Sequence, residues 1–275
     1  MKAVLQNFNN GNLTIEEVPP PSLKPEGIII RNVCSLVSSG TEKAAIEFAK
    51  MNPLQKSIAR PDLFYKVLNK VKQDGVISTG KIVKNLINAP LPLGYSSAGV
   101  VVEVGDKVGD ILPGQRVACA GLGYANHAEI IYVPRNLLTP IPDEVDFTEA
   151  SFITIGSIAM QGVRQANLTI GETVVVIGMG LVGQIISQIC IASGCNVIIA
   201  DIDKPKVELG LKLGADKGVI IKEKNLIPEV FNITSGNLAD AVIIAASTKS
   251  NDPLKNAPHL LRDRGRVVAV GDIGH

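Results

Sequence analysis

The sequence predicts an α/β protein in two parts: a barrel-like β domain interrupted by a helical insertion, and then a doubly wound parallel sheet. Short apolar runs separated by Gly, Pro and Asn dominate residues 1–145, a pattern typical of a small β-barrel. Apolar runs alternate with helical periodicity over residues 146–275, which is typical of βαβ units. A glycine-rich turn joins the first strand of this second part to a helix.

The composition fits an ordinary globular protein, with 46% hydrophobic residues, 19% charged residues and a formal net charge of +1. This balance gives no overall attraction to nucleic acid or to a membrane surface. The N-terminus lacks the apolar core of a signal peptide, and polar residues interrupt the most apolar stretch, 173–200. The four cysteines form no CxxC pair, as expected of reduced thiols. We therefore expect a cytoplasmic protein with no nucleic-acid or membrane partner.

The strands expected in the first part are residues 1–6, 13–18, 27–34, 99–104, 116–118 and 128–133. An Asn-Asn-Gly-Asn turn between the first two predicts a hairpin. Residues 41–90 form the helical insertion, with Thr41 as the expected N-cap. This insertion has nine basic and four acidic residues. A solvated helical surface explains such a run most simply. The more specific alternative is a basic surface that binds an anionic substrate.

The second part is expected to begin with a helix over 147–166. It continues with strands at 173–177, 196–201, 218–222, 240–245 and 266–270, and with helices at 181–193, 204–213 and 253–261. The full doubly wound pattern has six strands. We therefore expect this domain to lack its last strand, as in a truncated product or a fragment of a longer protein. Reduced activity and association through an exposed sheet edge would follow.

The run Gly-Met-Gly-Leu-Val-Gly at 178–183 follows an apolar β-branched strand and opens a helix. This is the context that a dinucleotide-binding Rossmann fingerprint requires. Gly178 would form the tight turn, Gly180 would admit a pyrophosphate, and Gly183 would let helix and strand pack closely. The alternative is an ordinary glycine turn of an α/β protein.

Asp201 ends the next strand, where a carboxylate would accept hydrogen bonds from the ribose hydroxyls and repel a 2′-phosphate. NAD is therefore expected in preference to NADP. Two further loops follow strands at the same edge of the sheet, where ligands of parallel sheets bind. The predicted cofactor-binding residues are Gly178, Gly180, Leu181, Val182, Gly183, Asp201, Ser247, Thr248 and Gly271.

With both parts in view, the chain resembles the medium-chain dehydrogenase/reductase superfamily, the alcohol dehydrogenase-like enzymes. Within it, the chain looks like a threonine dehydrogenase-like subgroup often fused to a glucose-fructose oxidoreductase-type module. The matching pieces occur in family order: Glu17-Val18-Pro19, Ser39-Gly40-Thr41-Glu42, the stretch 94–105 that starts Gly94-Tyr95-Ser96, Pro113-Gly114-Gln115-Arg116-Val117, Ala128-Glu129 and the glycine fingerprint.

The resemblance implies a GroES-like catalytic domain over 1–145, a Rossmann domain over 146–275, and a substrate in the cleft between them. It also implies that zinc is absent. Ser39, Tyr95 and the position near Ile155 or Gly156 stand where zinc members of the family have their metal ligands, and zinc needs thiolate, imidazole or carboxylate donors. A site rebuilt from Cys34, Cys119 and His127 has no supporting spacing.

A zinc-free site must polarise the carbonyl with hydrogen-bond donors and a general acid. The catalytic candidates are Tyr95, Ser39, Thr41, His127 and Tyr124, and Thr41 matches the family's proton-relay hydroxyl. Each has a plainer alternative, because Tyr95 could only fill the vacated metal pocket, Thr41 could only cap a helix, and His127 could be structural.

These features favour a zinc-independent, NAD(H)-dependent oxidoreductase acting on an alcohol or carbonyl substrate, including an anionic or sugar-like one. Two alternatives stay open. One is a quinone or enoyl reductase, because zinc-free members of the superfamily include these. The other is a non-catalytic or impaired dinucleotide-binding module, working as a homo-oligomer or beside a fused second oxidoreductase module.

Overall fold

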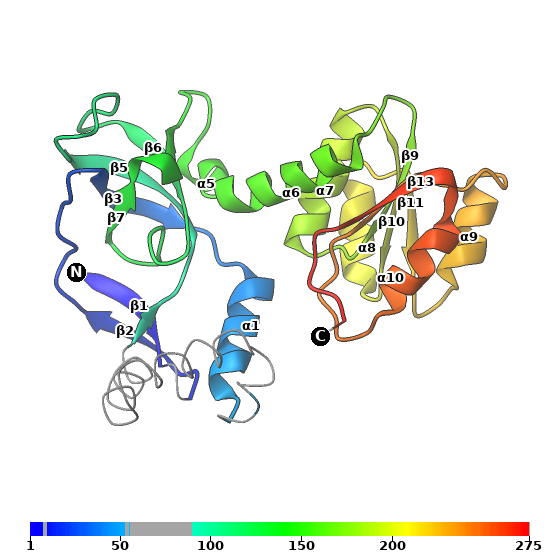
Figure 1. The fold of residues 1–275 in the computed structure, drawn as a ribbon, viewed down its shortest axis with the longest axis horizontal. Helices are drawn as coiled ribbons and strands as arrows, with labels where there is room; N and C mark the ends of the chain where they lie inside the picture. The colour runs from blue at the N-terminus through cyan, green and yellow to red at the C-terminus, as the bar shows by residue number, and fades with distance from the viewer. Residues whose placement is uncertain (8–9, 53–54, 56–89, 275) are drawn as a thin grey trace, which may run out of the picture. The chain divides into compact units, whose positions relative to one another are not determined.

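The computed structural model describes residues 1–7, 10–52, 55 and 90–274 (Figure 1). The chain divides into two compact units, Met1–Thr154 and Ile155–His275. The boundary predicted after residue 145 lies just before this division. Among the described residues, no helix combines the length and the apolar character needed to cross a membrane.

The first unit contains two antiparallel sheets. In the smaller one, β1 (Lys2–Gln6) lies between β2 (Leu13–Glu17) and β4 (Leu91–Pro92), which confirms the predicted hairpin. The larger sheet has the order β7-β3-β5-β6-β8 among the described residues. Its strands are β3 (Gly27–Ser35), β5 (Ser96–Val104), β6 (Arg116–Ala120), β7 (Ile130–Pro134) and β8 (Leu138–Pro140). A 3₁₀ turn at Arg135–Leu137 connects β7 to β8.

The interior of the first unit follows the period-2 pattern expected of half-buried strands. Ile28 and Ile30 of β3 point into one cluster with Val101 of β5, Val117 of β6 and Val133 of β7. All five side chains are almost fully buried. These side chains form the apolar core of the first unit.

Helix α1 (Ser39–Lys50) follows β3 and starts two residues earlier than the sequence predicts. Ser38 is its N-cap, so the expectation that Thr41 caps the helix is wrong. The backbone N–H of Ser38 instead donates to the Glu42 carboxylate at 2.9 Å, which anchors the first turn. Most of the predicted insertion, including Lys66, Lys70, Lys72, Lys81 and Lys84, lies outside the described residues.

The second unit is a parallel sheet of five strands in the order β11-β10-β9-β12-β13 within the described residues. This is the predicted doubly wound order, with the first strand central. The strands are β9 (Thr173–Ile177), β10 (Asn196–Asp201), β11 (Lys217–Ile220), β12 (Ala239–Ile244) and β13 (Leu261–Ala269). Their bounds agree with the predicted ones to within a few residues, except that β13 begins earlier.

Helices cover both faces of this sheet (Figure 1). Val174 and Val176 of β9 pack with α6 (Ile153–Ala166), α7 (Leu181–Ala192) and α8 (Lys204–Lys212). Val175 and Ile177 pack on the other face with α9 (Leu226–Ile233) and the 3₁₀ turn Ala257–Leu260 that follows α10 (Asp252–Asn256). Burial on both faces explains the unbroken apolar run of β9.

One helical prediction is wrong and one helix was missed. The helix expected over 147–166 is two helices, α5 (Phe147–Ala150) and α6, separated by a turn where the Ser96 hydroxyl donates to the Ser151 carbonyl and accepts from the Thr154 N–H. Helix α9 was not predicted. Its Pro228 lies in the first turn, where no intrahelical N–H is needed, so this proline does not break the helix.

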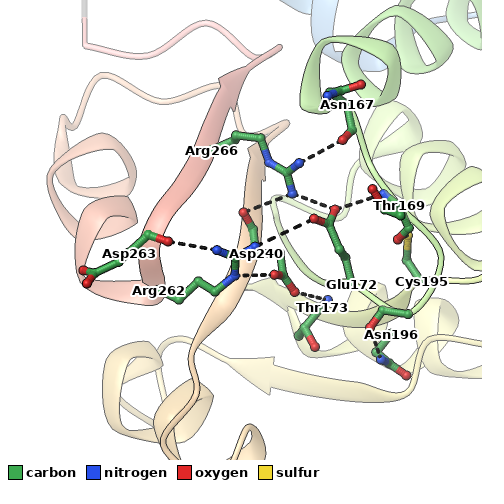
Figure 2. A network of polar contacts seen from close by, with 11 residues as sticks. Asn167, Thr169, Glu172, Thr173, Cys195, Asn196, Asp240, Arg262, Asp263 and Arg266 are labelled. Carbon is green, nitrogen blue, oxygen red and sulfur yellow. Dashed lines mark hydrogen bonds and ion pairs between the residues drawn. The ribbon is translucent and has the colours of Figure 1, made fainter.

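Paired charged side chains lie at the amino end of the parallel sheet (Figure 2). Arg266 of β13 donates to Glu172 at 2.6 Å and to the Asn167 carbonyl at 2.8 Å. Arg262 pairs with Asp240, whose other oxygen accepts the Thr173 N–H at 2.7 Å. The four charged groups are therefore paired with one another, and they tie β9, β12 and β13 together.

Candidate functional site

Two positions of the glycine-rich run after β9 have no room for a side chain. Gly178 has φ +96°, and a Cβ there would lie 2.5 Å from the backbone nitrogen of Ala246. A Cβ on Gly183 would lie 1.8 Å from the Gly178 carbonyl oxygen. The turn therefore depends on glycine for its conformation at Gly178 and for close helix–strand packing at Gly183.

Helix α7 begins directly after this turn. Gly180 is its N-cap, is exposed, and offers no side-chain oxygen to the first N–H groups of the helix. Those N–H groups have no acceptor within the helix, and they lie at the positive end of its dipole. This arrangement suits an anion that can approach the exposed Gly180.

Asp201 lies at the end of β10, beside the turn. Its side chain is buried, and its two oxygens accept separate backbone N–H groups: Met179 at 2.6 Å and Asp203 at 2.9 Å. The carboxylate therefore connects the glycine turn to the end of β10. A carboxylate oxygen accepts more than one hydrogen bond, so these contacts leave acceptor capacity for a ligand hydroxyl.

The loops after β9, β12 and β13 meet at this carboxyl edge. Ala246 contacts Gly178 on one side, and on the other a Cβ on Gly271 would lie 2.0 Å from its carbonyl oxygen. Thr248 is half-buried and its N–H donates to the Asp272 carbonyl at 2.9 Å, whereas Ser247 is exposed. The predicted loop residues are therefore near the glycine turn, and their contact with a cofactor stays a prediction.

In the first unit, Tyr95 and Thr41 are close to each other. Tyr95 is buried, and its hydroxyl lies 3.3 Å from the Thr41 hydroxyl. The Tyr95 carbonyl accepts from the Gly121 N–H and from the Thr154 hydroxyl, both at 2.9 Å. These two bonds hold the backbone carbonyl of Tyr95 in place.

His127 lies between two polar groups. Its Nδ1 is 2.8 Å from the Ser35 hydroxyl, and its Nε2 is 3.2 Å from both carboxylate oxygens of Glu42. A Cβ on Gly94, at φ +94°, would lie 2.9 Å from Nδ1, so this glycine makes room for the ring. Sequence reasoning did not identify Ser35 or Glu42 as candidates. Only Glu42 carried a signal, as the last residue of the Ser39-Gly40-Thr41-Glu42 motif.

The other two catalytic candidates lie apart from these contacts. Ser39 is exposed in the first turn of α1. The Tyr124 ring packs against Tyr132 at a centroid distance of 6.4 Å and lines a hollow of about 510 Å³ that β1 and Lys24 also line. The structure therefore pairs Tyr95 with Thr41 and His127 with Glu42, and does not add Ser39 or Tyr124 to either pair.

The thiols are poor candidates for chemistry. Burial raises the pKa of Cys119 to about 12 and that of Cys190 to about 12, so both are protonated at neutral pH. Across the part of the chain that the structure describes, no three His, Cys, Asp or Glu side chains are placed to hold a metal ion together.

Two family profiles match this sequence. Residues 66–143 match the alcohol dehydrogenase GroES-like domain, and residues 182–275 match the zinc-binding dehydrogenase domain. The two matches fall in the first and the second unit, in the order that the fold shows.

The curated relatives named here are 24–28% identical to this chain. An alcohol dehydrogenase of Geobacillus stearothermophilus is 28% identical over 264 residues, covering 83% of this chain and 77% of that protein. A sorbitol dehydrogenase of Bacillus subtilis is 24% identical over 266 residues, covering 83% and 74%. Three further relatives are putative D-xylulose reductases of Agrobacterium fabrum and Rhizobium meliloti and a zinc-type alcohol dehydrogenase-like protein of Haemophilus influenzae. The alignments cover 62%, 63% and 62% of those proteins. The chain thus spans under two thirds of their length.

Solved structures share the fold. Alcohol dehydrogenase TADH from Thermus sp. ATN1 has a TM-score of 0.73 at 23% identity, covering 98% of this chain and 77% of that one. A chain from Sinorhizobium meliloti 1021, solved bound to NADP, has a TM-score of 0.77 at 19% identity, covering 100% and 77%. Galactitol-1-phosphate dehydrogenase from Escherichia coli has a TM-score of 0.74 at 18% identity, covering 100% and 76%.

Proposed function

Because this chain belongs to the medium-chain, zinc-type alcohol dehydrogenase-like superfamily, we propose that it is an NAD(H)-dependent oxidoreductase acting on an alcohol or carbonyl substrate without a catalytic zinc ion. The observation that carries the proposal is the arrangement around the glycine turn. Gly178 and Gly183 stand where the backbone packs too closely for any side chain, and Asp201 holds the turn from the end of β10.

The residues present fit a dinucleotide. The N–H groups at the start of α7 would bind the pyrophosphate, and the Asp201 carboxylate would accept from the adenosine ribose hydroxyls. The bound nicotinamide would supply the chemistry by accepting or donating a hydride. Leu181 and Val182, half-buried in the first turn of α7, would contact the phosphates through their backbone only.

Asp201 supports NAD over NADP. Its carboxylate is held in place by two backbone N–H groups, so it cannot easily turn away from a second negative charge. A ribose 2′-phosphate placed beside it would be repelled.

The donor set does not fit a catalytic zinc ion. Ser96, which follows Tyr95, donates to the Ser151 carbonyl at 2.6 Å and accepts from the Thr154 N–H at 3.2 Å, so its hydroxyl is engaged. Ile155 is apolar and buried. Ser39 and Tyr95 offer neutral hydroxyls, whereas zinc sites are made of thiolates, imidazoles and carboxylates. The proposed reaction therefore uses no metal ion.

The Thr41 hydroxyl, which accepts from the Tyr95 hydroxyl, would instead donate a hydrogen bond to the substrate oxygen. Hydrogen-bond donors that are already fixed in direction stabilise developing charge without reorganising during the reaction. Two hydrogen bonds hold the Tyr95 carbonyl, which suits Tyr95 to orient Thr41. The names of the relatives make simple alcohols and sugar alcohols the first substrates to test.

The test is a titration of the purified chain with NADH and with NADPH, followed by nicotinamide emission. We expect saturable NADH binding at least tenfold tighter than NADPH binding, a difference of about 1.4 kcal/mol. Asp201→Asn should lose this preference, because it removes the charge while keeping an acceptor oxygen. Asp203→Asn is the matched control, since the Asp203 side chain pairs with Lys206 at the surface.

Metal analysis of the same sample and a substrate panel that includes sorbitol complete the experiment. Turnover with no stoichiometric zinc would support the proposal. Absence of binding by either nucleotide would contradict it, and a zinc content near one ion per chain would contradict its metal-free part.

A further inference from the structure

Three polar side chains of the first unit form a continuous series of hydrogen bonds at the start of α1. Ser35 is the last residue of β3, Glu42 lies in the first turns of α1, and His127 comes from the loop before β7. The imidazole of His127 lies between the other two, with Ser35 on Nδ1 and Glu42 on Nε2. Residues 85 and 92 positions apart in the sequence are thus brought into contact.

The partners of the imidazole determine which nitrogen carries its proton. An ionised carboxylate only accepts hydrogen bonds, so Nε2 donates to Glu42. In the neutral ring, Nδ1 is then the acceptor, and the Ser35 hydroxyl donates to it. This arrangement directs the Ser35 proton at a base whose far side is stabilised by a carboxylate.

The three groups differ in exposure. The side chains of His127 and Glu42 are 10% and 11% exposed, whereas Ser35 is half-buried at the end of its strand. The three hydrogen-bonded groups therefore run from a buried carboxylate to a serine that is partly exposed. Glu42 keeps a second contact, with the Ser38 N–H at 2.9 Å, which fixes the carboxylate relative to the imidazole.

We propose that Ser35, His127 and Glu42 form the proton relay of this protein, with Ser35 and His127 moving the proton and Glu42 positioning the imidazole. The role rests on the proposed oxidoreductase function. In alcohol oxidation, the substrate O–H proton passes to the Ser35 oxygen as the Ser35 proton passes to Nδ1 of His127. The electron pair of the broken C–H bond would leave as hydride, which a bound nicotinamide would accept, as the C=O bond forms. Carbonyl reduction runs through the same steps in reverse.

A plainer role would be to anchor α1 to the loop before β7. An anchor and a relay differ in what their loss changes. Loss of an anchor lowers the free energy of unfolding of the first unit, whereas loss of a relay lowers kcat and leaves that stability and cofactor binding intact. General acid–base groups typically contribute about 10²- to 10⁴-fold to rate, which separates the two roles clearly.

The first measurement needs no substrate. The ¹⁵N spectrum of the neutral His127 ring should show protonated Nε2 and unprotonated Nδ1. Glu42→Gln should weaken this preference, because an amide can donate as well as accept. Glu47→Gln, an exposed change on the same helix, is the control. A proton on Nδ1 in the wild-type protein would overturn the relay.

The second measurement is turnover with NAD⁺ and the best alcohol of the panel. His127→Gln and Ser35→Ala should each lower kcat by about 100-fold or more, and Glu42→Gln by a smaller factor, with the Kd for NADH unchanged within twofold. His259→Gln, at an exposed histidine of the second unit, should leave kcat unchanged. Normal kcat in His127→Gln or Ser35→Ala, at intact NADH binding, would overturn the relay and leave the proposed function standing. A wild-type chain that fails to bind NADH would contradict the proposed function, and the relay would fall with it.

Discussion

The two ends of the parallel sheet carry polar groups that are used in opposite ways. At the amino end, Glu172, Asp240, Arg262 and Arg266 pair with one another (Figure 2). At the carboxyl end, one carboxylate, Asp201, is bonded to backbone N–H groups only, beside an exposed helix N-terminus. The comparison teaches that density of charge does not mark a binding site. The candidate site is the end where the first N–H groups of an exposed helix N-terminus have no acceptor within the helix.

The difference also separates stability from binding. The charged partners at the amino end join β9, β12 and β13, through pairs 22 and 94 positions apart in the sequence. At the carboxyl end, the glycine turn contributes shape and free N–H groups rather than strand pairing. Substitutions at the two ends should therefore have separable effects.

The largest expected effect is on NADH binding in Gly178→Ala. The added Cβ would meet the backbone of Ala246 at 2.5 Å, at φ +96°, so the turn must move and carry the start of α7 with it. We expect the Kd for NADH to rise more than tenfold, together with a lower melting temperature, measured by nicotinamide emission and circular dichroism.

Gly171→Ala is the matched control for the backbone strain. Gly171 also has a positive φ, +84°, but nothing lies within 4 Å of the site of its Cβ. It should lose stability without losing NADH affinity. If both variants bind NADH equally well, the carboxyl end is not the cofactor site.

The second prediction concerns Arg266→Met at the amino end. The variant loses the charged hydrogen bond to Glu172 and the bond to the Asn167 carbonyl, and leaves a mostly buried carboxylate with fewer partners. We expect a loss of about 2 kcal/mol in the free energy of unfolding, with the Kd for NADH unchanged. Arg264→Met, an exposed neighbour on β13, controls for the change in net charge.

The readout must report on the second unit. The chain has four tyrosines and no tryptophan, and all four tyrosines precede residue 155. Far-UV circular dichroism, or hydrogen exchange of the β12 amides, therefore follows this unit where tyrosine emission does not. A weaker NADH affinity in Arg266→Met would contradict the separation of the two ends.

The same contrast explains what could be predicted from the sequence. The carboxyl end was readable because the run 178–183 and Asp201 are local signals placed directly after strands. The amino-end network was not, because Glu172 and Arg266 are 94 positions apart, and their pairing depends on strand order. Likewise, no local sequence pattern predicts that Glu42 and Ser35 contact His127. The single helix predicted over 147–166 failed for a related reason, since the backbone between α5 and α6 is bonded by Ser96, 55 residues before Ser151, and periodicity does not show this contact.

The smallest predicted effect is a change in acid stability that depends on Asp240. Burial alone would raise the pKa of this carboxyl, but the Thr173 N–H, Arg262 and Arg266 together hold the pKa below its ordinary value. Asp240 therefore stabilises the fold fully above the pKa of an unfolded aspartate, near 3.9, and this contribution is lost as pH falls through the lower folded-state pKa. The free energy of unfolding should decline below about pH 4 for this reason.

Arg262→Ala tests this origin, because Arg262 pairs directly with Asp240 and its removal brings the folded-state pKa closer to the unfolded one. The variant should be less stable at neutral pH and should lose less stability on acidification, so the two unfolding curves converge at low pH. Arg264→Ala removes the same charge from an exposed position of β13 and should keep the wild-type pH dependence. Parallel curves for wild type and Arg262→Ala would mean that the amino-end charges do not stabilise the sheet as a paired set, and the contrast between its two ends would rest on the glycine turn alone.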